Sequence, residues 1–263
     1  MRGLLASPLG FLIGLSLGAL GGGGSILAVP ALIYGAGQDS KAATTTSLVV
    51  VGAAALSGLV GHLHAGRVRV GAGLALGIAG VGGSFAGSAL NRAVPPRLLL
   101  LAFAALMVLA SWRMWPHHQA DPPRDARRTT ETARSAARPA SGMAVRVVAV
   151  GTALGLLTGF FGVGGGFVVV PGLVLALGYE LPVAVGTSLL VIAVNSAEAL
   201  AFRLSAGGLD WSVAVPFTVA ALIGALLGSG AATRVPADRL TRWFVGLLLA
   251  LAAYIGVRTL AGG

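Results

Sequence analysis

Long apolar stretches separated by short polar breaks run along almost the whole chain. Each half of the sequence contains four of them, at residues 8–37, 42–63, 70–92 and 96–115, then 144–178, 183–205, 211–233 and 236–259. The last three stretches of each half have the length of one helical crossing of a bilayer. They do not alternate apolar and polar residues, as the strands of a membrane β-barrel would. The pattern therefore predicts an all-α integral membrane protein.

The first stretch of each half is longer, and clustered glycines interrupt it. It contains GALGGGGSILAVP at residues 18–30 and GFFGVGGGFVVVP at residues 159–171. As one continuous helix it would be about 45 Å long, too long for one comfortable crossing and too short for two. Non-helical backbone at membrane depth is tolerated only where it is buried in protein or lines a watery cavity. We expect each stretch to form a re-entrant pair of half-helices that meet inside the membrane.

The two halves match each other at a constant offset of 141 residues. Residues 10–96 align with residues 151–237 without a gap, with 26 identities in 87 positions, among them Pro30 with Pro171 and Gly37 with Gly178. Internal repeats are typical of secondary transporters, and matching Gly/Pro interruptions indicate their binding sites. We therefore predict two membrane repeats, at residues 1–115 and 144–263, joined by a polar Arg- and Pro-rich linker at residues 116–143.

The basic residues predict that this linker lies in the cytoplasm, and with the inverted repeats favoured below, the N-terminus lies outside. Lys and Arg number 18 against 8 Asp and Glu, and more of them fall on the linker side, as the positive-inside rule requires. The same count results if each half crosses three times, which inverts the second repeat, or four times, which makes the repeats parallel. We favour inverted repeats because they explain the glycines.

Composition excludes several other functions. The chain is 56% hydrophobic and 10% charged, with a mean hydropathy of +0.90. Its Arg residues lack the interleaved aromatic platform of nucleic-acid proteins, so we expect no nucleic-acid partner. It has no Cys, and no Lys-Ser/Thr follows GVGGGF as in a nucleotide-binding loop. We expect no enzyme activity, no cofactor and no metal site. Membrane lipid is an expected partner, and a homo-oligomer is compatible with the sequence.

The glycine breaks and the hydroxyls that follow them predict a paired anion site. Backbone N–H groups at the start of a half-helix attract anions, and glycine lets a ligand approach the backbone closely. Hydroxyl groups can donate to an anion or cap the following helix. The alternatives are helix packing for the glycines and capping alone for the hydroxyls. The predicted site residues are Gly23, Gly24, Ser25, Thr46 and Ser47 in the first half, and Gly164, Gly165, Gly166, Thr187, Ser188 and Asn195 in the second.

Two titratable residues within the apolar stretches are candidates for proton coupling. A carboxylate inside a membrane is costly and is by default a functional candidate, so Glu198 could carry a coupling proton. His62 aligns with Arg203 and could titrate near neutral pH. The alternatives are an ion pair for Glu198, with Arg203 or a His of the other half, and an interfacial position for His62.

The duplicated order of Gly-rich segment, Pro, GTSL and a following Asn resembles the sulfite/sulfonate exporter family of TauE/SafE type. The match rests on GFFGVGGGFVVVPGL with AVGTSLLVIAVNS; the first half is looser, with Ala54 in the place of Asn195 and Ser25 in the place of Gly166. The resemblance implies a four-plus-four permease of the bacterial cytoplasmic membrane for small sulfur anions such as sulfite, thiosulfate or organosulfonates. A passive channel for small anions or solutes is the competing hypothesis. A scaffold without transport would not need the breaks.

Overall fold

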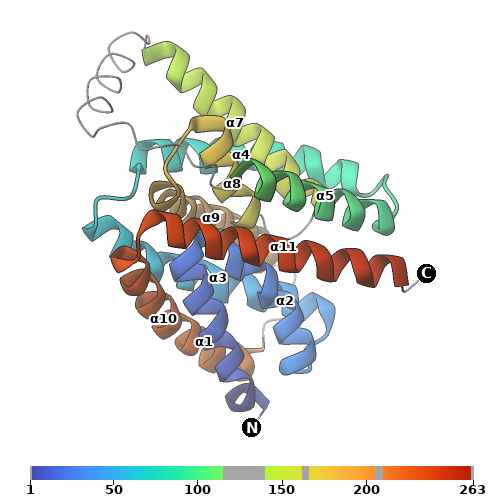
Figure 1. The fold of residues 1–263 in the computed structure, drawn as a ribbon. Coiled ribbons are helices and arrows are strands. Elements are labelled where there is room, and N and C mark those ends of the chain that lie inside the picture. The colour runs from blue at the N-terminus through green and yellow to red at the C-terminus, as the bar shows by residue number, and fades with distance from the viewer. Residues whose placement is uncertain (1, 115–139, 162–165, 205–209, 262–263) are drawn as a thin grey trace.

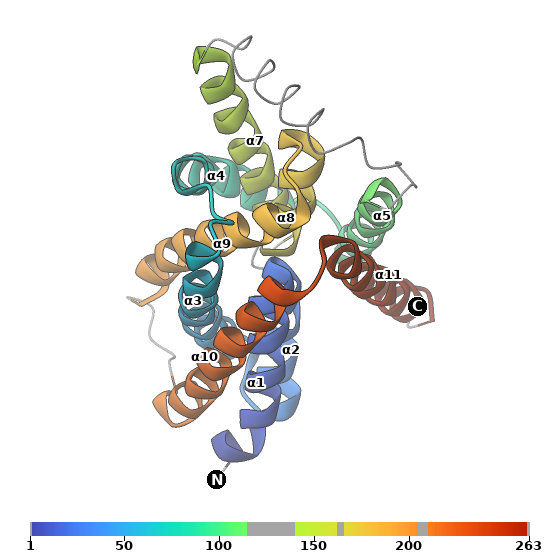
Figure 2. The same ribbon diagram turned by 60° about the vertical axis from the view of Figure 1, so that its left-hand side comes forward.

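The computed structural model describes residues 2–114, 140–161, 166–204 and 210–261, and their secondary structure is helical throughout (Figures 1 and 2). The first half contains α1 (Arg2–Leu20), the 3-10 helix η1 (Gly21–Leu27), α2 (Ala28–Pro30), the π-helical η2 (Ala31–Gly35), α3 (Ser40–His64), α4 (Val70–Asn91) and α5 (Pro96–Met114). The second half contains α7 (Ala140–Phe161), α8 (Gly166–Leu177), α9 (Leu181–Leu204), α10 (Trp211–Arg234) and α11 (Ala237–Ala261).

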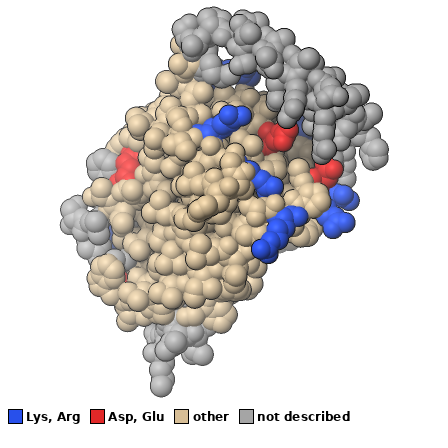
Figure 3. All heavy atoms as spheres, turned by 90° about the vertical axis from the view of Figure 1, so that its left-hand side faces the viewer, with Lys and Arg blue, Asp and Glu red and all other residues tan. Residues whose placement is uncertain are grey.

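The helices have the length and composition of membrane-spanning segments. Within the described residues, eight stretches are long and apolar enough to cross a membrane. Large apolar side chains such as Ile78 and Val257 are exposed on their outer surfaces, as expected where lipid replaces water. Figure 3 shows that on one face most of the charged side chains lie towards one side, that an acidic group lies at the opposite edge, and that most of the surface is uncharged. The predicted all-α membrane fold is confirmed.

The predicted linker at residues 116–143 lies outside the described residues except at its end. Residues 140–143 belong to α7, which therefore begins four residues before the predicted boundary at residue 144. The pattern missed this turn because a helix can extend beyond its apolar stretch when the backbone geometry continues, whatever the polarity of the side chains.

The first Gly-rich stretch ends α1 and sends the chain back along it. Gly21 follows α1 with a φ of 68°, a conformation open to glycine at little cost. A Cβ added at Gly24 would lie 2.6 Å from the backbone nitrogen of Leu17, and one at Gly35 would lie 2.5 Å from the side chain of Leu9. Residues further beyond the break thus lie further back along α1, so the two limbs form a hairpin.

α7 and α8 are arranged in a similar way on either side of residues 162–165, which are outside the described part. A Cβ added at Gly172 of α8 would overlap the side chain of Leu154 of α7. The helical segments that follow the two breaks also end with the same backbone geometry. Gly37 and Gly178 have φ values of 68° and 69°, and the next residue's N–H donates back to the carbonyl of Leu32 (3.1 Å) or Leu173 (3.2 Å), as in a glycine-capped helix end.

α1 packs along α10, and α7 packs along α4, with their backbones in direct contact (Figures 1 and 2). Small residues permit this close approach between membrane helices. The contacts of one pair recur 141 residues away in the other: Gly14 faces Ala221 as Gly155 faces Gly80, and Gly224 faces Phe11 as Gly83 faces Thr152. Four glycines of α4 at helical spacing serve packing, because all are buried against α9 or α7: Gly73, Gly77, Gly80 and Gly83.

The buried apolar side chains form two clusters on either side of this framework. One surrounds α8 and includes Phe103 of α5, Phe167 of α8 and Phe244 of α11. The other lies between α1, α3 and α10 and includes Leu17 and Phe217. α5 and α11 run side by side in both ribbon views (Figures 1 and 2) and close the first cluster on one side.

Candidate functional site

A cavity of about 320 Å³ lies beside the first Gly-rich break. Its walls come from η1 and α2, the first half of α3, α5, α9 and α11. Four hydroxyl side chains line it: Ser25, Thr44, Ser47 and Ser196. The remaining lining residues are apolar, namely Ile26, Val29, Pro30, Leu48, Val51, Leu100, Phe103 and Ile255. The described residues that line the cavity thus include hydroxyl donors but no charged side chain.

The hydroxyls of the cavity differ in how far they are already engaged. Ser25 Oγ donates to the carbonyl of Gly22 at 2.7 Å, and Ser47 Oγ donates to the carbonyl of Thr44 at 2.8 Å. Within the described residues, Ser196 Oγ makes no hydrogen bond, and Ser196 packs against Gly52 of α3. A hydroxyl has one proton to donate. Ser196 therefore offers the donor that is most available to a bound anion.

The start of α8 packs directly against the first Gly-rich break. A Cβ added at Gly22 would overlap the carbonyl of Gly166, and one added at Gly166 would lie 2.6 Å from Ser25 Oγ. On the other side of the turn, a Cβ added at Gly21 would lie 2.6 Å from Ser188 Oγ. Ser25, Gly166 and Ser188 of the predicted site are therefore brought together around the first break.

Other predicted residues of the first half face elsewhere. Gly23 faces Leu247 of α11, and Gly24 faces the backbone of α1. Thr46 is fully buried, and its Oγ1 has no hydrogen-bond partner in the described structure. Of the five predicted residues of this half, Ser25 and Ser47 line the cavity.

In the second half, Gly164 and Gly165 lie outside the described residues. Thr187 Oγ1 accepts a hydrogen bond of 3.1 Å from the backbone N–H of Arg69, which immediately precedes α4. Ser188 Oγ donates to the carbonyl of Val185 at 2.8 Å. Asn195 Oδ1 is buried, without a hydrogen-bond partner in the described part, beside Gly80 of α4. Thr187 and Asn195 thus face α4, and neither lines the cavity.

Sequence reasoning did not select Thr44 or Ser196 for the site. The spacing of these two residues along their helices could have identified them. Thr44 lies three residues before Ser47, on the same face of α3, whereas Thr46 points away from that face. Ser196 follows Ser188 by eight residues, a little over two helical turns. The adjacent Asn195 drew attention because its amide is the more polar group.

The two candidates for proton coupling lie outside the cavity lining. His62 is fully buried, and its Nε2 lies 3.0 Å from the carbonyl oxygen of Gly18 near the end of α1. His62 is therefore buried within the protein, near the end of α3. The last carbonyls of a helix have no partner within it, and His62 satisfies one of them; Asn91 Nδ2 donates to Phe160 at the end of α7 in the same way, at 2.6 Å. Glu198 is partly buried and has no hydrogen bond or ion pair among the described residues.

A multi-pass bundle with interrupted apolar helices and a hydroxyl-lined cavity defines a membrane transport protein as the class. The chain belongs to the sulfite exporter TauE/SafE family, whose model matches residues 6–255. It is a multi-pass bacterial membrane protein of this transporter family.

Curated relatives agree with this assignment. A "Probable membrane transporter protein" of Xylella fastidiosa (strain 9a5c) is 33% identical over 249 residues, which cover 94% of this chain and 92% of the relative. "Probable membrane transporter protein YunE" of Bacillus subtilis (strain 168) is 28% identical over 238 residues, covering 86% and 85%. No solved structure matches the chain.

Proposed function

We propose that the protein is a secondary transporter that moves a small sulfur-containing anion, such as sulfite, thiosulfate or an organosulfonate, across the cytoplasmic membrane. The observation that carries the proposal is the cavity at the first Gly-rich break, where four hydroxyl side chains converge in otherwise apolar walls. The family's name supplies the substrate class.

The proposal includes two inverted repeats with re-entrant first segments. It is supported by the hairpins at both breaks and by the helix contacts that recur at the same offset of 141 residues. With the N-terminus outside, α3 and α5 run inward, and α9 and α11 run outward. Thr44 and Leu100 lie early in inward helices, and Ser196 and Ile255 lie late in outward helices. In this topology the cavity occupies the outer half of the membrane.

In the proposed site, neutral hydrogen-bond donors bind the anion. Sulfite and thiosulfate present several acceptor oxygens. The Ser196 hydroxyl can donate to one of them directly, whereas Ser25 and Ser47 donate to the anion only by giving up their present bonds to backbone carbonyls. A hydrogen bond to a charged group contributes about 1.5–3 kcal/mol, against about 0.5–1.5 kcal/mol for a neutral pair. A few such bonds without a fixed cation bind the anion weakly enough for it to leave, as transport requires.

The test is uptake and binding of sulfite, thiosulfate and taurine by the purified protein in liposomes. We expect saturable uptake of at least one sulfur anion, weakened about tenfold by Ser196→Ala through loss of one charge-assisted bond. Ser111→Ala is the matched control, because Ser111 Oγ is buried without a hydrogen-bond partner among the described residues and Ser111 lies outside the cavity lining. Equal affinities in both variants would contradict the site. Unsaturable ionic currents would favour a passive channel.

A further inference from the structure

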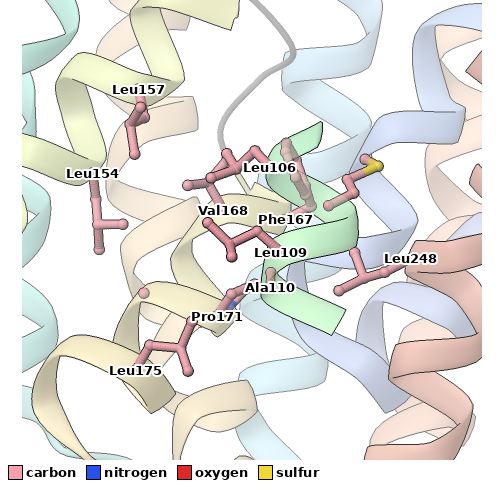
Figure 4. Close-up of a pocket in the computed structure, with 12 residues that line it drawn as sticks. Leu106, Leu109, Ala110, Leu154, Leu157, Phe167, Val168, Pro171, Leu175 and Leu248 are labelled. Atoms are coloured by element: carbon pink, nitrogen blue, oxygen red, sulfur yellow. The ribbon is translucent and has the colours of Figure 1, made fainter. Parts of the chain in front are cut away.

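A second, smaller space lies next to the cavity, on the other side of two aromatic rings. This apolar pocket has a volume of about 120 Å³ and is lined by residues of α5, α7, α8 and α11. Figure 4 shows Phe167, Leu106 and Ala110 around it, with Leu154 on the α7 side and Leu248 on the α11 side. The described lining contains no ionisable side chain.

Phe103 and Phe167 separate the two spaces. Phe103 lines the hydroxyl cavity, and Phe167 lines the apolar pocket. Their ring centroids are 4.6 Å apart with an interplanar angle of 73°, the edge-to-face geometry that aromatic pairs favour. Phe103 also meets Phe161 edge to face at 5.3 Å. One helical turn after Phe103, Met107 already belongs to the apolar pocket, so the cavity ends at this ring pair.

We propose that Phe103 and Phe167 form a hydrophobic barrier that closes the inner end of the anion cavity. The inference deepens the proposed function, on which it rests, by naming the residues that block the path. Both rings are almost completely buried, at 2% exposure each. An apolar constriction excludes water, and an anion cannot cross it without losing hydrogen bonds that no neighbour replaces.

The surroundings indicate which ring moves when the barrier opens. Phe167 directly follows Gly166, whose backbone is held against Gly22 without room for a Cβ. Phe103 lies within the continuous helix α5, whereas the atoms nearest to a Cβ added at the glycines of the first break all belong to other elements. Rotation of the Phe103 side chain, or a shift of α5, therefore opens the barrier, and Phe167 remains as the fixed side.

Cysteine labelling tests the barrier independently of substrate, since the native chain contains no Cys. Ala110→Cys places a thiol in the apolar pocket, and Ser47→Cys places one in the cavity. Each is exposed to an impermeant, water-soluble thiol reagent added from outside. We expect Ser47→Cys to react readily and Ala110→Cys slowly. Adding Phe103→Ala should raise the reaction rate of Ala110→Cys by about tenfold or more.

The matched control is Phe217→Ala, which removes an equally buried ring from the other apolar cluster and should leave the rate at Ala110→Cys unchanged. Phe103→Leu, a milder truncation, should give an intermediate rate and serves if Phe103→Ala does not fold. Two results would overturn the barrier. One is fast labelling of Ala110→Cys while Phe103 is intact. The other is no acceleration at Ala110→Cys in either Phe103 variant although Ser47→Cys reacts. If Ser47→Cys itself stays unreactive, the proposed position of the cavity in the outer half of the membrane, and with it the barrier, is wrong.

Discussion

Gly22 of η1 and Gly166 of α8 lie backbone to backbone, with no space for a side chain on either. A Cβ on Gly22 would overlap the carbonyl of Gly166, and one on Gly166 would lie 3.2 Å from the Cα of Gly22 and 2.6 Å from Ser25 Oγ. The contact joins the two halves of the chain at the edge of the hydroxyl cavity. Glycine at these positions therefore determines both the assembly of the halves and the shape of the site.

Gly22→Ala should destabilise the protein. Overpacking a well-packed interior costs about 1–3 kcal/mol, and here the overlap is with backbone, which cannot rotate away. We expect a lower melting temperature in detergent and a smaller monodisperse fraction in gel filtration. Gly230→Ala is the control, because a Cβ there meets nothing within 4 Å. A Gly22→Ala protein as stable as the control would show that the halves do not meet as described.

Two neighbouring glycines of α4 should respond in opposite directions to the same change. A Cβ on Gly83 would overlap the carbonyl of Thr152, whereas a Cβ on Gly82 meets nothing within 4 Å. Gly83→Ala should separate α4 from α7 and lower the melting temperature. Gly82→Ala should be neutral or stabilising by up to about 0.5–1 kcal/mol, because alanine has the higher helix propensity. Equal melting temperatures would contradict the α4–α7 packing.

Thr187→Val should reduce stability more than anion affinity. The change removes the acceptor for the Arg69 N–H while keeping the side chain's shape, and a lost neutral hydrogen bond costs about 0.5–1.5 kcal/mol. Thr187→Ser keeps the hydroxyl and should retain most of the stability. Melting temperature and anion affinity are measured on both variants. An affinity loss in Thr187→Val as large as that in Ser196→Ala would instead place Thr187 in the anion site.

The two topologies differ in where they place Lys41 and Arg239, both exposed. With inverted repeats, Lys41→Cys faces the outside and Arg239→Cys the cytoplasm, because an odd number of crossings separates them. With parallel repeats, both face the outside. An impermeant thiol reagent added to intact cells should therefore label Lys41→Cys and spare Arg239→Cys until the cells are opened. Labelling of both in intact cells would reject the inverted arrangement.

Acid should weaken the start of α10. Asp210 caps this helix by accepting hydrogen bonds from the Ser212 side chain at 2.6 Å and from its backbone N–H at 3.0 Å. These bonds lower the pKa of Asp210 below its ordinary value of 3.8. A carboxylate with a lowered pKa stabilises the fold at higher pH and loses this contribution as the pH falls through its folded pKa.

The melting temperature should therefore fall more steeply below about pH 4 in the native protein than in Asp210→Asn, whose amide oxygen still caps the helix without titrating. Asp210→Ala should have the lower melting temperature at neutral pH. Identical pH profiles for the native protein and Asp210→Asn would show that the cap does not contribute through its charge.

The sequence by itself determined the helical membrane architecture and the end of α1 at the first glycine cluster. Twenty apolar residues in succession must form a helix in lipid, because no water is present to satisfy the backbone, and this requirement is local. The same reasoning explains why glycine clusters could be recognised as helix breaks before any contact was known. The glycine stripe of α4 was likewise recognisable, because helical spacing alone aligns its members on one face.

Only the tertiary structure decided which polar residues face the cavity. Of the predicted residues Ser25 and Ser47 line it, but Thr44 does so in place of Thr46, and Ser196 in place of Asn195. The choice depends on how each helix is rotated about its own axis, and a rotation of one residue, about 100°, exchanges neighbouring side chains. That rotation is set by packing against distant segments: Gly73 and Gly77 of α4 admit Leu190 and Val194 of α9, and this turns Asn195 towards α4 and Ser196 towards the cavity.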